Sequence, residues 1–152
     1  MMSLSTHFTL PEFLRSESAA RHDISMEPST TVVANLTHLA REVLDPIREA
    51  AGCPIIVTSG YRPHELNALI GGAANSDHLY GLAADIHALG HDVDWLLAVI
   101  RRIAPMLPIK KAIDEFHAWV HVSIDLGNSP KREFLVATRE AGKTVYRTWE
   151  VV

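Results

Sequence analysis

Cysteine is nearly absent from this chain, which has one, Cys53, among 152 residues. A single thiol cannot form an internal disulfide, and it excludes the cysteine-rich zinc sites that hold many small domains together. Cys53 lies between Gly52 and an apolar run, so we expect a buried small hydrophobe. The nucleophile elbow G-x-S-x-G and the HExxH zinc motif are missing as well. Serine hydrolases, cysteine hydrolases and thermolysin-type metalloproteases are therefore disfavoured.

Long apolar runs and clusters of positive charge are also missing. No stretch approaches the roughly 20 apolar residues that span a bilayer, and the opening MMSLSTHFTLPEF lacks the basic and apolar regions of a signal peptide. The net charge is −4, and basic residues form at most short pairs such as Lys110–Lys111. This pattern does not indicate a nucleic-acid partner. We expect a monomer made in the cytoplasm, without a signal peptide or a membrane segment.

The composition, 47% hydrophobic and 21% charged, is that of an ordinary globular protein, and the length fits one domain. Apolar spacing and turn residues predict helices first and a mostly antiparallel sheet afterwards, an α+β order. Pro46 is expected to disturb the end of the long helix. Helices are predicted near 10–14, 32–51, 63–70 and 92–104, with strands near 54–58, 82–87, 109–115, 119–124, 133–138 and 144–149.

Two segments carry residues suited to a metal: SDHLYGLAAD, with His78 and Asp85, and WVHVS, with His121. Neutral imidazole and carboxylate are good zinc ligands, and three protein ligands leave a position free for water. On a continuous helix His78 and Asp85 would stand about 10 Å apart along the axis, too far for one ion. The segment must therefore fold back, and Gly81 can adopt the positive φ that such a turn needs.

Strand alternation predicts how Asp85 and His121 are presented. Aliphatic residues before and after each of them would face a shared core, while Asp85 and His121 would face a groove on the other side. An isolated histidine in a strand is usually structural, and a carboxylate in an apolar strand is usually paired or ligating. Spacing alone leaves both a metal site and a structural ion pair open.

The pattern Ser76-x-His78-x-x-Gly81-x-Ala83-x-Asp85, followed by Trp119-Val120-His121-Val122, resembles the zinc D-Ala-D-Ala carboxypeptidases. That family includes vancomycin-resistance dipeptidases and phage L-alanyl-D-glutamate endopeptidases. The run TSGYR (58–62), the opening HFTLPEF and the closing GKTVY are similar to its phage and prophage branch. The resemblance covers nearly the whole chain.

The resemblance implies a hedgehog/DD-peptidase α+β fold, with Zn²⁺ bound by His78, Asp85 and His121. It implies one zinc peptidase domain over 1–152, in which 1–28 form a lead-in helix and loop and 29–152 the catalytic core. It also implies that Arg62 and Ser76 bind substrate. The guanidinium of Arg62 suits bidentate pairing with a carboxylate, and a salt bridge that fixes the SGYR turn is the alternative.

The general base is less directly given by the sequence. Several family members have an acid three positions before the last histidine, where this chain has Ala118. A three-residue loop at 117–119 would put Glu115 opposite His121 in the hairpin. A loop of two or four residues would put Asp114 there instead. Because the phage branch resembles this chain in having Glu-Phe before Trp-Val-His, we predict Glu115. His117 stays a possible auxiliary donor.

The sequence thus predicts a zinc-dependent peptidase that cuts peptidoglycan stem peptides at bonds involving D-amino acids, with a zinc-activated water. Such an enzyme would act on the cell wall after release, in the manner of a phage lysis protein. The alternative is a non-catalytic zinc-binding module that recognises peptidoglycan or a protein partner. A carboxylate within reach of the metal would distinguish the two.

Overall fold

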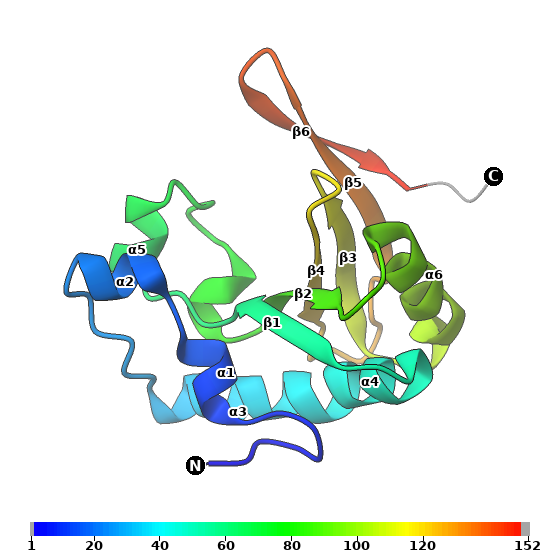
Figure 1. The fold of residues 1–152 in the computed structure, drawn as a ribbon, viewed down its shortest axis with the longest axis horizontal. Coiled ribbons are helices and arrows are strands. Elements are labelled where there is room, and N and C mark those ends of the chain that lie inside the picture. Colours follow the sequence, from blue (N-terminus) through cyan, green and yellow to red (C-terminus); the bar gives the residue numbers. More distant parts are fainter. Residues whose placement is uncertain (1, 150–152) are drawn as a thin grey trace.

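The computed structural model describes residues 2–149, which form an α+β fold (Figure 1). The helices are α1 (Leu10–Leu14), α2 (Glu17–Arg21), α3 (Thr30–Leu39), the π-helical η1 (Ala40–Leu44), α4 (Asp45–Ala51), α5 (His64–Leu69), the 3₁₀-helical η2 (Asp77–Tyr80), α6 (Val93–Ile103) and η3 (Ala104–Met106). The strands are β1 (Ile55–Ser59), β2 (Ala83–Ala88), β3 (Ile109–Glu115), β4 (Trp119–Ile124), β5 (Glu133–Glu140) and β6 (Lys143–Thr148). None of the helices in this range combines the length and apolarity needed to cross a bilayer.

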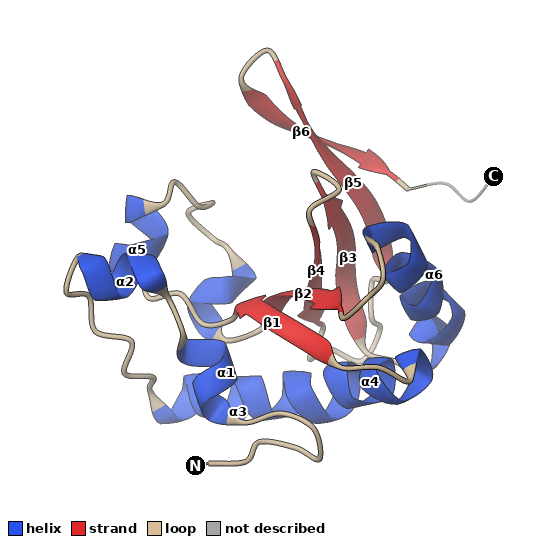
Figure 2. Ribbon diagram, viewed as in Figure 1, coloured by secondary structure: helices blue, strands red, loops and turns tan. Residues whose placement is uncertain are grey.

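All the strands belong to one six-stranded sheet with the order β1-β2-β4-β3-β5-β6. Neighbouring strands are antiparallel except β3 and β5, which are parallel. The sheet is strongly twisted, and the β5–β6 hairpin projects past the rest of it (Figure 2). Ala141 and Gly142 form the tip of this hairpin with positive φ angles of 51° and 76°, as the sequence predicts for a tight turn. The predicted α+β class is confirmed.

The long helical stretch before β1 continues through Pro46 instead of breaking. Ser29 caps its start by accepting a hydrogen bond from the Val32 backbone at 3.1 Å. The irregularity expected near Pro46 takes the form of the π-helical turn η1, and Pro46 lies in the first turn of α4. A proline is tolerated there because its missing N–H matters least at the start of a helical segment.

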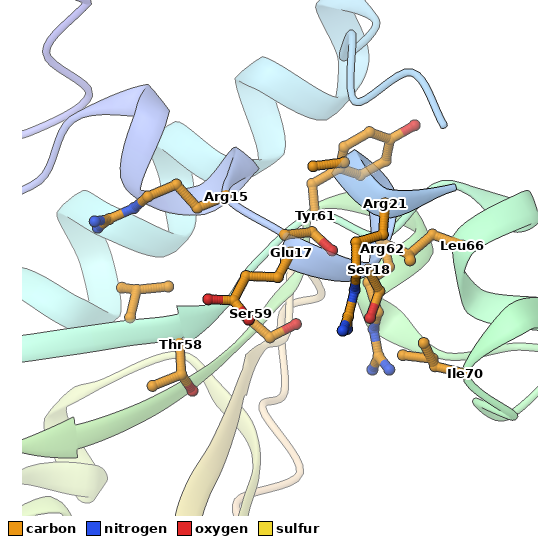
Figure 3. A pocket seen from close by; sticks show the side chains of 13 residues that line it. Arg15, Glu17, Ser18, Arg21, Thr58, Ser59, Tyr61, Arg62, Leu66 and Ile70 are labelled. Carbon is orange, nitrogen blue, oxygen red and sulfur yellow. The ribbon is translucent and has the colours of Figure 1, made fainter. Parts of the chain in front are cut away.

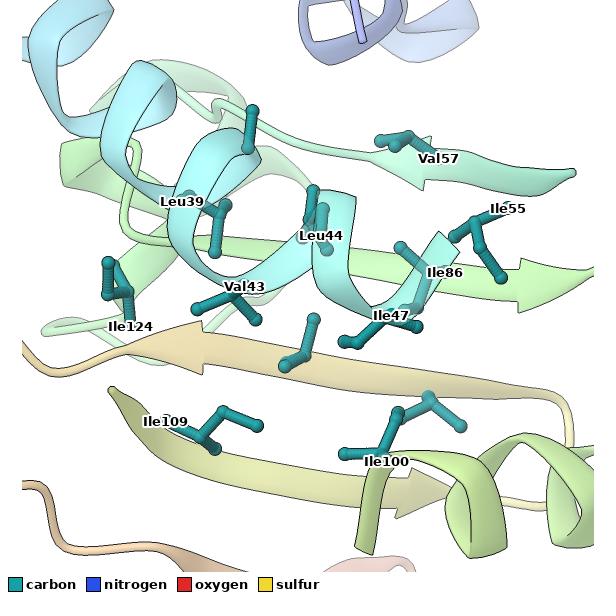
Figure 4. Close-up of a cluster of buried hydrophobic side chains, with 14 of the residues drawn as sticks. Leu39, Val43, Leu44, Ile47, Ile55, Val57, Ile86, Ile100, Ile109 and Ile124 are labelled. Atoms are coloured by element: carbon teal, nitrogen blue, oxygen red, sulfur yellow. The ribbon is translucent and has the colours of Figure 1, made fainter. Parts of the chain in front are cut away.

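The hydrophobic core lies between the sheet and the helices α3, α4 and α6 (Figure 4). From the helices come fully buried side chains such as Leu39, Ile47 and Ile100, and from the strands Ile86 and Ile109. Cys53 packs against this cluster but is only partly buried, so the expectation of a buried thiol was wrong. Each buried aliphatic side chain contributes about 1.5–3 kcal/mol, and together they fix the strands that carry the polar residues.

The N-terminal segment packs into this core and is not a loose arm. Leu4, Phe8 and Phe13 are at most 2% exposed and belong to the same cluster. The backbone of Phe13 passes so close to Gly60 that an added Cβ would lie 2.7 Å from it. The structure also adds α2, capped by Ser16, within a stretch expected to be loop.

Gly81 ends η2 in the left-handed conformation that the spacing of His78 and Asp85 predicts, with φ of 73°. A Cβ at this position would lie 2.9 Å from the Val32 carbonyl oxygen. We expect Gly81→Ala to destabilise the fold by about 2–4 kcal/mol, the sum of left-handed strain and a backbone clash. Chemical denaturation measures the change.

Gly71→Ala is the matched control, because Gly71 has φ of 74° and open space where its Cβ would lie. It should cost about 1 kcal/mol, from backbone strain alone. Equal losses in the two variants would show that the approach to Val32 contributes nothing.

Candidate metal centre

His78 is positioned by a short turn that its own neighbours stabilise. The Ser76 hydroxyl accepts a hydrogen bond from the His78 backbone at 3.2 Å, and Asp77 pairs with Lys110 of β3 at 2.9 Å. The His78 ring is 1% exposed, and its Nδ1 donates to the Gly60 carbonyl oxygen at 2.7 Å. This bond fixes the tautomer in which Nε2 is a free lone-pair donor.

Asp85 and His121 are brought together by direct pairing of β2 and β4. They are cross-strand partners in the antiparallel register, and each is 9% exposed. On the same strands Ala84, Ile86, Val120 and Val122 are fully buried on the opposite face. The predicted alternation of aliphatic and polar faces is thus confirmed in both strands.

The side chains of His78, Asp85 and His121 converge on one point. Asp85 Oδ1 lies 3.2 Å from His78 Nε2 and 3.2 Å from His121 Nδ1. One donor atom from each residue lies within 4.8 Å of the other two. Tetrahedral zinc with bonds of about 2.0–2.1 Å separates its ligand atoms by about 3.3 Å, so this donor set fits zinc in spacing and in chemistry.

The charge of Asp85 depends on the two imidazoles beside it. Burial alone raises the pKa of this carboxyl, but His78 and His121 outweigh burial through charge and hydrogen bonds. The resulting pKa lies well below the usual value for aspartate. Asp85 therefore stays ionised at neutral pH, as a metal ligand must be.

Glu115 is the acid that faces this cluster. Its Oε1 lies 3.8 Å from His121 Nδ1, and its side chain is 17% exposed. Burial raises the pKa of Glu115 and the charge of Asp85 adds to this, while His121 and Arg62 act in the opposite direction. A carboxylate that holds a proton more readily than usual is well suited to proton transfer.

The loop between β3 and β4 spans 116–118, one residue earlier than expected. Glu115 is therefore opposite Trp119, and Ile113 is opposite His121, which corrects the predicted pairing. The parity is unchanged by this shift, so Glu115 still shares a face with His121. Phe116 and His117 make the turn with φ of 58° and 57°.

Asp114 lies on the other face of β3 and does not reach the centre. It is 1% exposed, pairs with Val120, and its carboxylate bonds both the backbone and the ring of His117. The His117 ring lies 3.9 Å from Asp94 of α6. These three residues form a separate ion-pair cluster whose two outer members are exposed. Of the residues considered as bases, the structure brings Glu115 alone to His121.

Arg62 lies at the edge of the centre. Its backbone N–H donates to the His78 carbonyl oxygen at 3.0 Å, and its Nε is buried without a partner among the described residues. Burial lowers the pKa of Arg62, and the charges of Asp85 and Glu115 raise it. Ser76 makes the cap of η2 described above, so its hydroxyl already has a local structural role.

Tyr146 is a neighbour of Glu115 that no pattern in the sequence predicts. Glu115 pairs with Ala137 of β5, and Ala137 pairs with Tyr146 of β6, so the three share one face of the sheet. Ala137 is fully buried between them. Burial raises the pKa of the Tyr146 phenol, and the charge of Glu115 raises it further. The row of Glu115, Ala137 and Tyr146 exists because β3 and β5 pair in parallel. Local sequence does not predict which strands pair.

The raised pKa of Glu115 has a measurable effect on stability. The pKa of Glu115 is higher in the folded protein than in the unfolded chain. Folding therefore favours the protonated side chain, and the stability that this form contributes is lost as the pH rises. At neutral pH the ionised Glu115 opposes folding. We expect Glu115→Gln to raise the melting temperature of the zinc-free protein at neutral pH. The difference should shrink as the pH falls below about 4, where both side chains are neutral. Thermal unfolding followed by circular dichroism tests this, and a less stable variant at neutral pH would contradict it.

Comparison with known proteins agrees with this geometry. No curated protein shows significant similarity to the chain. The family described as Peptidase M15 matches residues 6–123, a range that contains Arg62, His78, Asp85, Glu115 and His121 and ends before the β5–β6 hairpin. The match confirms the family resemblance, while the phage and prophage branch stays a prediction. The chain belongs to the peptidase M15 family of zinc metallopeptidases.

Proposed function

We propose that this protein is a zinc-dependent peptidoglycan peptidase, which cleaves stem-peptide bonds involving D-amino acids. The observation that carries the proposal is the convergence of His78, Asp85 and His121 on one point, with Glu115 beside it. Two imidazoles and one carboxylate would hold the metal and leave a coordination position open.

The proposed ligands are His78 through Nε2, Asp85 through its carboxylate and His121 through Nδ1. Zinc bound there would supply Lewis-acid chemistry, which activates water near neutral pH and polarises a carbonyl group. The chain's own contribution is a rigid donor set. His78 is held by its bond to the Gly60 carbonyl, and Asp85 and His121 are held by strand pairing.

Glu115 is the proposed general base. Its carboxylate lies on the same face as His121, close enough to accept a proton from water beside the metal ligands. It would then deliver this proton to the amine that leaves when the peptide bond breaks. The raised pKa supports this double role, because the same group must take up and release a proton near neutral pH.

Arg62 is proposed as the substrate anchor, and Ser76 as a second contact. The buried Arg62 Nε has no partner among the described residues, so its guanidinium is available to a bound anion. Ser76, two residues before His78, would contact substrate while it caps η2. The position of Glu115 favours this enzyme over a non-catalytic zinc module, since a module would not need a carboxylate at this place.

We predict that His78→Ala or His121→Ala abolishes stoichiometric zinc binding and peptidase activity while the protein stays folded. Each change removes one of three ligands, and the hydrophobic core lies on the other face of the sheet. Metal analysis after gel filtration measures the zinc content. The exposed His38, whose ring pairs with Glu42 one turn further along the helical stretch, provides the control His38→Ala. Wild-type zinc content in either ligand variant would refute the assignment.

We predict that Glu115→Gln keeps zinc but lowers turnover by at least about 100-fold, the usual scale for a general base. The amide has the size of the carboxylate but cannot accept the proton. Steady-state kinetics on purified muropeptides measure the loss, and Asp114→Asn is the matched control on the opposite face of β3. A larger loss of turnover in Asp114→Asn than in Glu115→Gln would contradict the assignment.

The decisive experiment for the function is mass spectrometry of peptidoglycan digests with and without added zinc. It reports activity and the cleaved bond together. Zinc-dependent release of stem-peptide fragments is expected. Stoichiometric zinc binding without any cleavage, on walls of differing peptide chemistry, would favour the binding module.

A further inference from the structure

The turn between β3 and β4, which directly follows Glu115, has an unusual backbone. Phe116 and His117 have φ of 58° and 57°, and the Ala118 N–H donates to the Glu115 carbonyl oxygen at 3.0 Å. Positive φ at both central residues is the geometry of a type I′ turn, for which Asn-Gly is the favoured sequence. A bulky side chain is strained in this left-handed region, because its Cβ comes too close to the following carbonyl oxygen. Within residues 2–149, this is the one place where two consecutive residues other than glycine have positive φ.

Asp114 makes the hydrogen bonds that hold the second of these residues. Its carboxylate accepts from the His117 backbone N–H at 2.8 Å and also binds the His117 ring through Nδ1. Asp114 is 1% exposed, and among the ion pairs of the described residues its partner is His117 alone. A buried charge is tolerated only when it is paired and hydrogen-bonded, so Asp114 and His117 depend on each other.

Phe116 is held from the other side of the turn. Its backbone N–H donates to the Ala137 carbonyl oxygen of β5 at 3.1 Å. Its ring packs edge-on against Trp119 of β4, with 6.1 Å between the ring centroids, and the Arg139 guanidinium lies 5.7 Å from its centroid. The strained turn is therefore fixed by contacts to three strands, β3, β4 and β5.

Glu115 lies between Asp114 and this turn. Its side chain faces His121, with 3.8 Å between Oε1 and Nδ1, whereas Asp114 points to the opposite face of β3. Because successive side chains alternate, any change in the turn that rotates the end of β3 also moves the Glu115 carboxylate away from His121. Proton transfer needs hydrogen-bond reach, and a displacement of about 1 Å can lower a rate by up to about 100-fold.

We propose that Asp114 and His117 are positioning residues for the general base. Their hydrogen bonds hold the strained turn, and the turn keeps the Glu115 carboxylate beside His121. The inference rests on the proposed function and deepens it. Strained backbone persists where the surrounding contacts over-determine it, and such strain is concentrated at active sites. A histidine in the turn gives Asp114 a ring to bind, which an unstrained glycine could not.

The first test removes the two hydrogen bonds. We expect Asp114→Ala and His117→Ala each to lower kcat by about tenfold, with KM within about twofold and zinc content unchanged, because substrate and metal are bound by other residues. Asp114→Asn should lose less, since its amide oxygen can still accept from the His117 backbone. Asp94→Asn is the matched control. Its carboxylate lies 3.9 Å from His117 Nε2, but both side chains are exposed, so turnover should not change.

The second test relieves the strain. His117→Gly removes the same ring as His117→Ala, but glycine adopts positive φ without strain. It should keep kcat within about threefold of the wild type, and combined with Asp114→Ala it should restore the lost turnover. Thermal unfolding verifies that each variant is folded. If Asp114→Ala does not fold, the comparison of His117→Ala with His117→Gly decides the matter at an exposed position.

The third measurement needs no turnover. In the zinc-free protein, the nuclear Overhauser effect between the side-chain protons of Glu115 and His121 reports the contact that the turn is proposed to maintain. It should weaken in Asp114→Ala and His117→Ala, and it should return when His117→Gly is combined with Asp114→Ala.

The outcomes separate the positioning role from the proposed function. A kcat within twofold of the wild type in both alanine variants would overturn the inference, and so would a loss that His117→Gly does not restore or that accompanies a loss of zinc. A weakened contact between Glu115 and His121 in a protein that cleaves no stem peptide would keep the positioning role and contradict the peptidase. An active enzyme whose kcat and contact are the same in both alanine variants would do the reverse.

Discussion

The structure is organised around one buried carboxylate, Asp85, which accepts contacts from His78 and His121 at 3.2 Å each. An ionised group in this position would be costly without such partners. Two conditions follow from it. The chain must reverse between His78 and Asp85, which Gly81 achieves in the left-handed conformation, and β2 must pair with β4 so that Asp85 is opposite His121. Both conditions are met by backbone geometry, so the three side chains are held before any ligand binds.

Side chains alternate between the two faces of the sheet, so one face packs the hydrophobic core and the other presents the polar residues of the candidate metal centre. On one face, aliphatic side chains from β2 and β4 pack under α3, α4 and α6. On the other face the same strands present Asp85 and His121, and β3 adds Glu115. Asp114, the neighbour of Glu115, points to the helical face and binds His117 there. Asp114 and Glu115 are adjacent in the sequence, but they lie on opposite faces of β3 and therefore have different environments.

The N-terminal segment extends this arrangement beyond the metal ligands. Phe13 anchors it in the core, and its backbone passes against Gly60 just before Arg62. The same segment then forms α2, and Arg15 and Arg21 of this segment line a cavity of about 720 Å³ that Arg62 also lines (Figure 3). A cavity lined by three arginines thus lies close to the proposed metal centre.

Local sequence determined much of this protein. Apolar periodicity gave the helices and strands within a few residues, and the spacing around Gly81 required the reversal that unites His78 and Asp85. Alternation also determined which side of β2 and β4 would be polar. Tertiary structure alone decided the rest: the loop at 116–118, the separation of Asp114 from Glu115, the parallel β3–β5 pairing beside Tyr146, and the cavity that residues of α2 and Arg62 line together. The reason is physical. Periodicity reports which face of an element is buried, whereas strand partners and cavities depend on contacts between segments far apart in the chain, which no local pattern records.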